Sequence, residues 1–403
     1  MPSETTGKNH NPPAVYRDPN LLIVFGVTLM AVLGVSSITP AFPTIGRALG
    51  LPFQAVGNII TAFTLPGVLL TPILGILTDR WSRKRILVPS LMVFGLAGSA
   101  CSLVRDFELL LVLRFVQGIG AASLSALYIT LIGDLYHGKV RTTAMGYNAS
   151  VLSVGTAGYP LIGGALATLG WVYPFALPIL AVPIGFLVLF SLENPEPKEK
   201  QALRRYFQQA WRSIKHRQAM GLFTLTLMTF AIIYGAYLTY LPFLMENAFH
   251  ASSLVIGIAM SGMSLTTALM SSQLGKLARV YSQRTLLQAS CGLYAAALLM
   301  IPLTPSLWVL GIPVILFGLA QGLSIPNLQT LLAGLAPLEH RGAFMSINGM
   351  ILRLGQTVGP PLMGIVFSAW GIEGTFYAAA AIAAAMFVLT ATIIKKRRKA
   401  DGS

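Results

Sequence analysis

Twelve long apolar stretches dominate the sequence and restrict what it can fold into. Crossing a bilayer as an α-helix takes about 20 consecutive apolar residues, and each stretch has roughly that length. They begin near Leu21, Gln54, Arg85, Phe107, Thr143 and Trp171 in the first half, and near Met220, Ser252, Leu286, Ser306, Ala343 and Gly374 in the second. The pattern predicts an all-α membrane protein with 12 transmembrane helices.

Composition points to the same class. Of the 403 residues, 55% are hydrophobic and only 10% are charged, which is too few to cover a water-soluble surface of this size. The net charge of +15 does not indicate nucleic-acid binding, because the basic residues lie in short loops between apolar stretches. Cys101 and Cys291 lie inside apolar stretches and suit packing. We expect no nucleic-acid partner, no metal and no cofactor.

Lysine and arginine are distributed unevenly between the two sides of the predicted membrane. With the N-terminus inside, 24 of the 28 fall in cytoplasmic loops and tails, and only Arg47 and Arg105 fall outside. The positive-inside rule therefore predicts a multi-pass protein of the cell inner membrane with both termini in the cytoplasm. The first twenty residues hold no apolar core before a small-residue cleavage site, so no cleaved signal peptide is expected.

The two groups of six stretches are related by a repeat of 200 residues. The turn GILTDRWSRKR at 75–85 returns as GKLARVYSQRT at 275–285, and Asn148 returns as Asn348. Two pseudo-symmetric six-helix bundles with a binding site between them are typical of secondary transporters. The expected division is an N-terminal tail at 1–20, bundles at 21–192 and 219–395, a central loop at 193–218 and a basic tail at 396–403.

The central loop allows two interpretations. Residues 201–216 would place Leu203, Phe207, Trp211 and Ile214 on one side of a basic amphipathic helix that lies along the membrane surface. A flexible, solvated linker fits the same residues equally well.

The turn at 75–85 resembles the loop between spans 2 and 3 of the major facilitator superfamily. The matching positions are Gly75, Leu77, Asp79, Arg80, Arg83 and Lys84, whereas Ser82 stands where glycine is usual. From about Leu21 to Ile394 the chain resembles the twelve-helix drug:proton antiporters of that family. The resemblance implies the major facilitator fold, a small-molecule substrate and coupling to protons.

The resemblance also gives the turn a role in conformational control. A carboxylate at the inner end of span 2 can meet an arginine or the positive N-terminus of a helix. In the family that helix is span 11, which starts here beside Arg341. We expect a latch that favours the outward-open state, formed by Gly75, Asp79, Arg80, Arg83, Lys84 and Arg341. The alternative is that the basic residues only enforce the topology.

The segment RFVQG in span 4 resembles a second family motif, in which the arginine is connected with proton coupling. Arg114 and Gln117 occupy its polar positions. An arginine inside a membrane span is a functional candidate by default. Alternatively, Arg114 extends outward and pairs with Asp106 or Glu108 near the outer surface.

A glycine-rich pattern in span 5 resembles the one associated with antiporters. The matching residues are Gly155, Pro160 and Gly164, and the second copy retains Gly359 and Pro360. Glycine and proline let spans pack closely and bend, which suits a rocking gate. Tyr159 stands where the family has glycine.

Arg353 is the charged residue that lies deepest in a predicted span, about ten residues into span 11. No acidic residue or histidine lies near the middle of any predicted span. An arginine at the bilayer centre costs about 2.5–3.5 kcal/mol, so it should face a cavity or a partner. Gln356 shares its helical stripe, and a guanidinium can bind a carboxylate or phosphate. The alternatives are a structural bond to backbone carbonyls, or a part of the family's gate.

Further candidates for the cavity are Gln117, Asn148, Tyr234, Tyr237 and Gln321. Tyr234 and Tyr237 are expected to form an aromatic pair that suits flat amphipathic substrates. The favoured function is export of such compounds by rocker-switch alternating access, in a monomer. The alternative is transport of an organic anion or acidic lipid, in which the protonated substrate carries the proton. No enzyme is expected, because the spans hold no cluster of catalytic side chains.

Overall fold

A computed structural model describes residues 12–80, 82–193, 217–336 and 341–393. These residues are helical almost throughout, and eleven of their helices are long and apolar enough to span a membrane. The all-α membrane fold is therefore confirmed. Residues 1–11 of the expected N-terminal tail, the basic tail at 396–403 and the helix expected at 201–216 lie outside the described residues.

The N-terminal bundle contains six membrane crossings. A short 3₁₀ turn, η1 (Pro12–Arg17), precedes them. Crossing 1 combines α1 (Pro19–Ser36), the 3₁₀ turn η2 (Thr39–Ala41) and α2 (Phe42–Leu49), and crossing 2 combines α3 (Phe53–Val56) with α4 (Asn58–Arg80). Crossings 3 to 6 are α5 (Arg83–Ala100), α6 (Phe107–Leu135), α7 (Gly138–Leu169), and η4 (Tyr173–Leu180) with α8 (Ala181–Ser191).

The C-terminal bundle follows the same plan. Crossing 7 combines α10 (Arg217–Ala231), the π-helix η5 (Ile232–Tyr240) and α11 (Leu241–Phe249). Crossings 8 to 10 are α12 (Ser253–Val280), α13 (Gln283–Met300) and α14 (Leu307–Leu335). Serine or aspartate side chains cap the starts of α6, α12, α13 and α14, by accepting a backbone N–H that has no partner within the helix.

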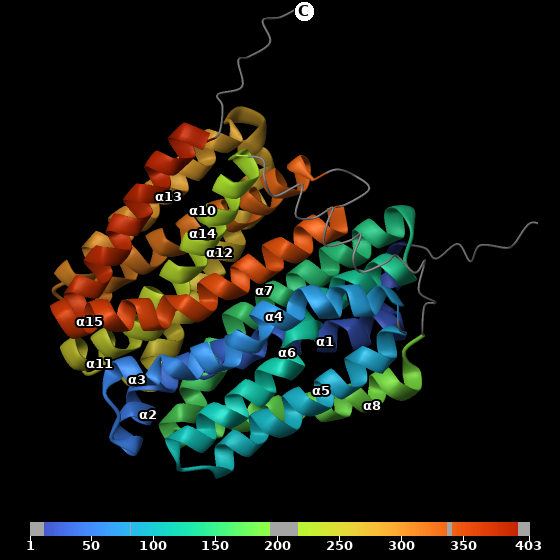
Figure 1. Ribbon diagram of the computed structural model, residues 1–403, viewed down its shortest axis with the longest axis horizontal. Coiled ribbons are helices and arrows are strands. Elements are labelled where there is room, and N and C mark those ends of the chain that lie inside the picture. The colour runs from blue at the N-terminus through green and yellow to red at the C-terminus, as the bar shows by residue number, and fades with distance from the viewer. Residues whose placement is uncertain (1–11, 81, 194–216, 337–340, 394–403) are drawn as a thin grey trace, which may run out of the picture.

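The last helix, α15 (Arg341–Ile393), forms two crossings rather than one. Its 53 residues would extend about 80 Å as a straight helix, more than twice the roughly 30 Å of a bilayer's hydrocarbon core. Gly371 interrupts it with φ 69°, a left-handed conformation that favours glycine. The two arms, 341–370 and 372–393, diverge from this bend (Figure 1). The described residues thus make twelve crossings, as the sequence predicts.

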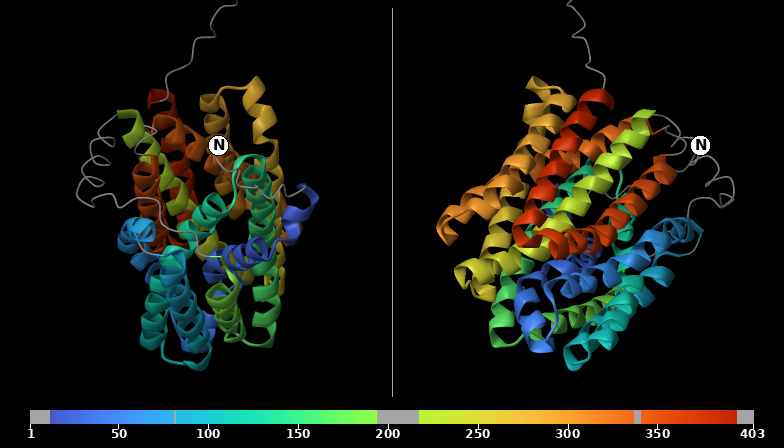
Figure 2. Two further views of the ribbon diagram at one scale, coloured as in Figure 1. Left: turned by 90° about the vertical axis from the view of Figure 1, so that its right-hand side faces the viewer. Right: turned by 60° about the vertical axis from the view of Figure 1, so that its left-hand side comes forward.

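Each bundle packs around its own apolar core. One core gathers residues of crossings 1 to 6 together with Phe243 of α11, and the other gathers residues of crossings 7 to 12. Figures 1 and 2 show the same division from three sides. Two long helix pairs form most of the contact between the bundles, because α7 packs on α12 and α4 packs on the first arm of α15. Any site between the bundles is bordered by these four helices.

Crossings 1 and 7 are related by the repeat, but the number of residues that separates corresponding positions changes along the helix. Gly155 of α7 packs against Leu29, whereas Gly355 of α15 packs against Leu227, a displacement of 198 residues in the partner helix. Farther on, the left-handed residues that end α2 and α11, Gly50 and His250, are 200 apart. Crossing 7 therefore contains two extra residues between these points.

Helix type explains where the extra residues go. Crossing 7 contains the π-helix η5, whereas crossing 1 contains the 3₁₀ turn η2 at the corresponding depth. A π-helix fits more residues into a turn than an α-helix does, and a 3₁₀ helix fits fewer. The two halves therefore present different side chains to their interiors despite their common plan.

Candidate functional site

Arg353 reaches from the C-terminal bundle to the N-terminal one. It lies on the first arm of α15, and its side chain runs along Gly67 of α4, so that a Cβ at Gly67 would lie 3.1 Å from the Arg353 Cδ. Its NH1 atom donates to the Gln356 Oε1 at 3.1 Å, one helical turn away. Gln356 is buried. The helical stripe expected from the sequence is therefore present at the contact between the bundles.

Two tyrosines from different bundles complete the surroundings of Arg353. The hydroxyls of Tyr234 in η5 and Tyr128 in α6 lie close enough to interact with its charge. Tyr234 also lies beside the Gln356 side chain. We call Arg353, Gln356, Tyr234, Tyr128 and Gly67 the arginine site. Four crossings, two from each bundle, contribute to it.

Threonines join the bundles directly beside the arginine site. The Thr357 hydroxyl of α15 hydrogen-bonds to the Thr64 hydroxyl of α4 at 2.9 Å. The Thr61 hydroxyl donates to the Thr357 carbonyl oxygen at 3.1 Å. These weak neutral bonds align the two helices without locking them, because each contributes only about 0.5–1.5 kcal/mol.

The end of the molecule that contains α2, α3 and α11, here called the far end, is closed. Arg47 of α2 forms an ion pair with Glu246 of α11. Phe53 stacks on Phe243, with ring centroids 4.4 Å apart, and Phe367 packs against Phe53 from α15. Aromatic packing and an ion pair thus hold the two bundles together at this end.

The glycine and proline residues singled out in the sequence lie at these contacts. A Cβ at Gly164 of α7 would overlap the Ser253 carbonyl oxygen of α12, and the Pro160 carbonyl lies equally close to Gly257. On the other side of the molecule, Pro360 packs against Gly57. These small residues let backbones from different bundles touch.

The remaining members of the glycine pattern act within one bundle. Gly155 faces Leu29 and Val32 of α1, and a Cβ at Gly359 would lie 2.7 Å from the Ala231 carbonyl oxygen of α10. They therefore set helix packing inside the bundles rather than the contact between them.

The opposite end of the molecule is here called the basic end, because helices start or finish there near Arg83, Lys84, Lys139 and Lys276. Gly146 of α7 and Gly262 of α12 have nothing within 4 Å of where a Cβ would be. On the other side, Thr71 of α4 packs against Gly349 of α15. The described contacts thus close the far end.

The Arg47–Glu246 pair supports a test of far-end closure. Arg47→Glu places like charges together and should increase the fraction of molecules with an open far end about two- to fivefold, since an exposed pair contributes about 0.2–1 kcal/mol. The reporter is Thr39→Cys, a fully buried position at this end, read by its rate of maleimide labelling.

The charge-swapped double variant, Arg47→Glu with Glu246→Arg, is the matched control and should return the labelling rate to the starting value. Both native cysteines are buried and should not react with maleimide. Equal rates in the single and double variants would show that the pair does not hold the far end closed.

Arg114 is fully enclosed in the N-terminal bundle, with 1% of its surface exposed. It donates to the carbonyl oxygens of Gly34 at 2.9 Å and Ile59 at 3.4 Å, and to the Gln117 Oε1 at 2.7 Å. Its guanidinium carbon also lies 4.3 Å from the centre of the Phe63 ring. The side chain does not extend outward to the surface, and it ties crossings 1, 2 and 4 together.

The glycine that follows Gln117 brings α6 against α4. A Cβ at Gly118 would overlap the Phe63 carbonyl oxygen, whereas Gly158 of α7 has nothing within 4 Å of its Cβ position. Gly118→Ala should therefore lower the thermal unfolding midpoint of the detergent-purified protein, with an overpacking cost of about 1–3 kcal/mol. Gly158→Ala should leave it unchanged or raise it, because alanine favours helix. Equal midpoints for the two variants would contradict this packing.

The basic turn forms its described contacts inside one bundle. The Arg83 Nε lies 3.0 Å from the Asp134 Oδ2 at the end of α6, and the Lys84 Nζ donates to the Leu189 carbonyl oxygen in the last turn of α8 at 3.1 Å. The side chains of the remaining expected latch residues, Gly75, Asp79, Arg80 and Arg341, lie outside the described part of the structure. The latch between bundles stays a prediction.

The other candidates are dispersed. Asn148 accepts a hydrogen bond from Thr28 at 2.7 Å inside the N-terminal bundle. Tyr237 is buried in the C-terminal core, stacked on Phe317 with centroids 4.2 Å apart, so it does not pair with Tyr234. Gln321 lies in α14 with a buried Oε1 that accepts no hydrogen bond in the described structure. The described residues contain no group of metal ligands.

Sequence reasoning missed the residues that close the far end. Arg47 and Glu246 have opposite charges and are separated by nearly one repeat length, so pairing them by the repeat would have found them. The place of Tyr128 beside Arg353 depends on how the bundles meet, which no local sequence pattern specifies.

Known proteins resemble the chain over most of its length. The sequence model of the Major Facilitator Superfamily matches residues 24–249 and 244–403. A bacillibactin exporter of Bacillus subtilis (strain 168) is 25% identical over 362 residues, or 87% of this chain and 90% of the exporter. The quinolone resistance protein NorA of Staphylococcus aureus (strain MRSA252) is 22% identical over 393 residues, or 94% and 97%.

A solved structure shares the fold. It is a bacterial homologue of the human lysosomal transporter Spinster, in an inward-facing and occupied conformation. Its TM-score with this chain is 0.81 at 18% identity, and the match covers 96% of this chain and 98% of that one.

Proposed function

Because the chain belongs to the Major Facilitator Superfamily, whose members are membrane transporters, we propose that it exports small amphipathic compounds by alternating access between its two bundles. The names of the relatives, a bacillibactin exporter and a quinolone resistance protein, support export of such compounds. The domain division given above and a monomeric state belong to the same proposal, since the two bundles together surround one candidate site.

One observation carries the proposal, namely the position of Arg353 where the bundles meet. Its guanidinium lies against α4 and near Tyr128 of the N-terminal bundle, while Gln356 and Tyr234 hold it from the C-terminal bundle. A group bound there contacts both bundles, so its binding energy depends on how they are arranged. Differential contact of this kind is what lets a substrate shift a conformational equilibrium.

The basic end is the cytoplasmic end in this proposal, in agreement with the positive-inside rule. The described arrangement, closed at the far end, is then the inward-facing state of the cycle. A compound would enter from the cytoplasm or inner leaflet and bind beside Arg353. Separation of the far-end contacts and formation of the latch around Asp79 would then turn the site outward.

A second candidate function is transport of an organic anion or acidic lipid. Arg353 favours it, because a guanidinium binds a carboxylate or phosphate through two parallel hydrogen bonds. The sequence places no acidic residue or histidine near the middle of a span, so the proton would be carried on the substrate. In the first candidate function, proton coupling is inferred from the resemblance to antiporters.

Everted membrane vesicles distinguish these functions. Vesicles that contain the protein should accumulate an amphipathic dye when energised, and the accumulation should be absent from vesicles without it. Ethidium tests a cationic substrate and carboxyfluorescein an anionic one, each with and without a protonophore. No accumulation of any amphipathic compound by energised vesicles would refute export.

A further inference from the structure

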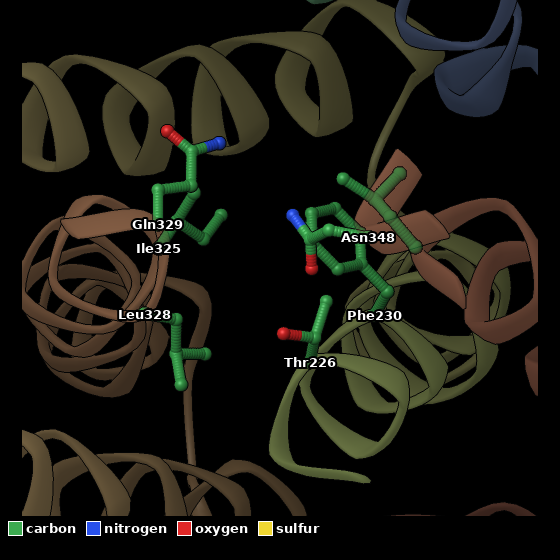
Figure 3. A pocket seen from close by; sticks show the side chains of 7 residues that line it. Thr226, Phe230, Ile325, Leu328, Gln329 and Asn348 are labelled. Atoms are coloured by element: carbon green, nitrogen blue, oxygen red, sulfur yellow. The ribbon is translucent and has the colours of Figure 1, made fainter. Parts of the chain in front are cut away.

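The C-terminal bundle contains a pocket of its own, apart from the arginine site. It lies between α10, α14 and the first arm of α15, and encloses about 210 Å³ including its open mouth. Phe230, Ile325, Leu328 and Leu352 supply an apolar lining, and Asn348, Gln329 and Thr226 supply the polar groups (Figure 3). The lining residues all come from one bundle.

Asn348 is the unusual member of this lining. Only 5% of its surface is exposed, and its Oδ1 atom accepts no hydrogen bond within the described structure. In Figure 3 its amide points into the space between α10 and α14. A buried acceptor without a partner costs about 1–3 kcal/mol, so a donor that enters the pocket recovers that free energy.

The repeat shows how the N-terminal bundle avoids the same cost. Thr28 and Thr226 occupy corresponding positions, since each donates to the carbonyl oxygen four residues earlier and precedes the leucine that faces the paired glycine. In the N-terminal bundle the Thr28 hydroxyl also bonds the Asn148 Oδ1 at 2.7 Å. In the C-terminal bundle the corresponding threonine and asparagine face each other across the pocket.

We propose that this pocket is a substrate subsite for an apolar ring that carries one O–H or N–H donor. The donor bonds the Asn348 Oδ1, and the ring packs on Phe230 and Leu328. This subsite rests on the proposed export function and adds to it a substrate class, namely compounds with a phenol-like or arylamine-like group.

The size of the pocket restricts what enters it. The 210 Å³ includes solvent at the open mouth, so a bound ring lies partly in the mouth, and the rest of a larger compound lies outside. Leu352 lines the pocket, and Arg353 follows it on the same helix. A compound with a second, polar part can therefore extend toward the arginine site. Because one bundle forms the whole subsite, the ring stays bound while the bundles move.

A labelling experiment locates binding at the pocket. Gln329 is exposed at its edge, and both native cysteines are buried, so Gln329→Cys provides one reactive thiol in the full-length protein. The probes are 2-naphthol and its methyl ether, 2-methoxynaphthalene, which differ by one hydrogen-bond donor. We expect 2-naphthol to slow maleimide labelling at a concentration about tenfold lower than the ether, the ratio that one hydrogen bond to a buried group supplies.

Two variants test the residues. Asn348→Leu should remove the difference between the probes, and it should fold because no bond to the Oδ1 is lost. Asn148→Leu is the matched control from the other bundle and should keep the difference. Leu352→Trp fills the pocket and should abolish protection by both probes.

Equal protection by the two probes in the Gln329→Cys protein would overturn the subsite. A difference that persists in Asn348→Leu, or protection that survives Leu352→Trp, would overturn it as well. The labelling experiment does not depend on transport. Failure of vesicle accumulation with intact protection would therefore count against export alone, and intact accumulation without protection would count against the subsite alone.

Discussion

Arg353→Ala is expected to reduce transport of an anionic substrate by a factor of about 10 to 100. A hydrogen bond to a charged group contributes about 1.5–3 kcal/mol, and each 1.4 kcal/mol changes an affinity tenfold. Arg353→Lys keeps the charge but loses the planar fork that also bonds Gln356. Its transport rate should therefore lie between those of the original protein and Arg353→Ala. The measurement is the initial rate in proteoliposomes that contain equal amounts of each variant.

The matched control is Arg105→Ala, which removes the same charge near the far end, where Arg105 lies over the Trp171 ring. It should transport at the original rate. If Arg353→Ala lowers transport of an anion but not of a cation, the organic-anion function is favoured. Unchanged transport of both in Arg353→Ala would remove Arg353 from the substrate path.

Arg114→Leu is expected to have the largest effect on stability. It removes three hydrogen bonds and a cation–π contact from a fully buried site, and leaves Gln117 without its partner. A hydrogen bond from a charged group contributes about 1.5–3 kcal/mol, so the loss of three such bonds is costly. We expect a much lower yield of folded protein and a clearly lower unfolding midpoint in detergent.

Arg114→Lys separates a structural role from proton coupling. An ammonium cannot reproduce the fork that reaches both Gly34 and Ile59. The Arg114→Lys protein should therefore also be destabilised, although less than Arg114→Leu. Normal stability with transport that no longer responds to a pH gradient would favour the coupling role instead.

The sequence predicted the membrane fold well because its signals are local. Apolar length defines a crossing, and serine or aspartate caps mark the starts of α6, α12 and α14 within about one residue. The glycine break at Gly371 explains why one continuous helix still provides two crossings. The repeat of Asn148 at Asn348 likewise identified the two halves.

Side-chain direction was harder to predict, because it depends on helix type and on the partner bundle. Tyr234 and Tyr237 would share a face in an α-helix, but they lie in the π-helix η5, where the wider turn sends Tyr237 into the core. The carbonyl partners of Arg114 come from crossings 1 and 2, and no local pattern specifies them. The partners of Arg353 likewise come from several helices.

Counterflow most directly tests the claim that the protein transports its substrate by alternating access. Proteoliposomes preloaded with unlabelled substrate are diluted into a trace of labelled substrate without any ion gradient. An alternating-access transporter should accumulate label transiently above equilibrium, and the initial rate should saturate with concentration. We predict this overshoot for the original protein and a much smaller one for Arg353→Ala. Label that rises only to equilibrium, with a rate that never saturates, would indicate a channel or a leak and contradict the account.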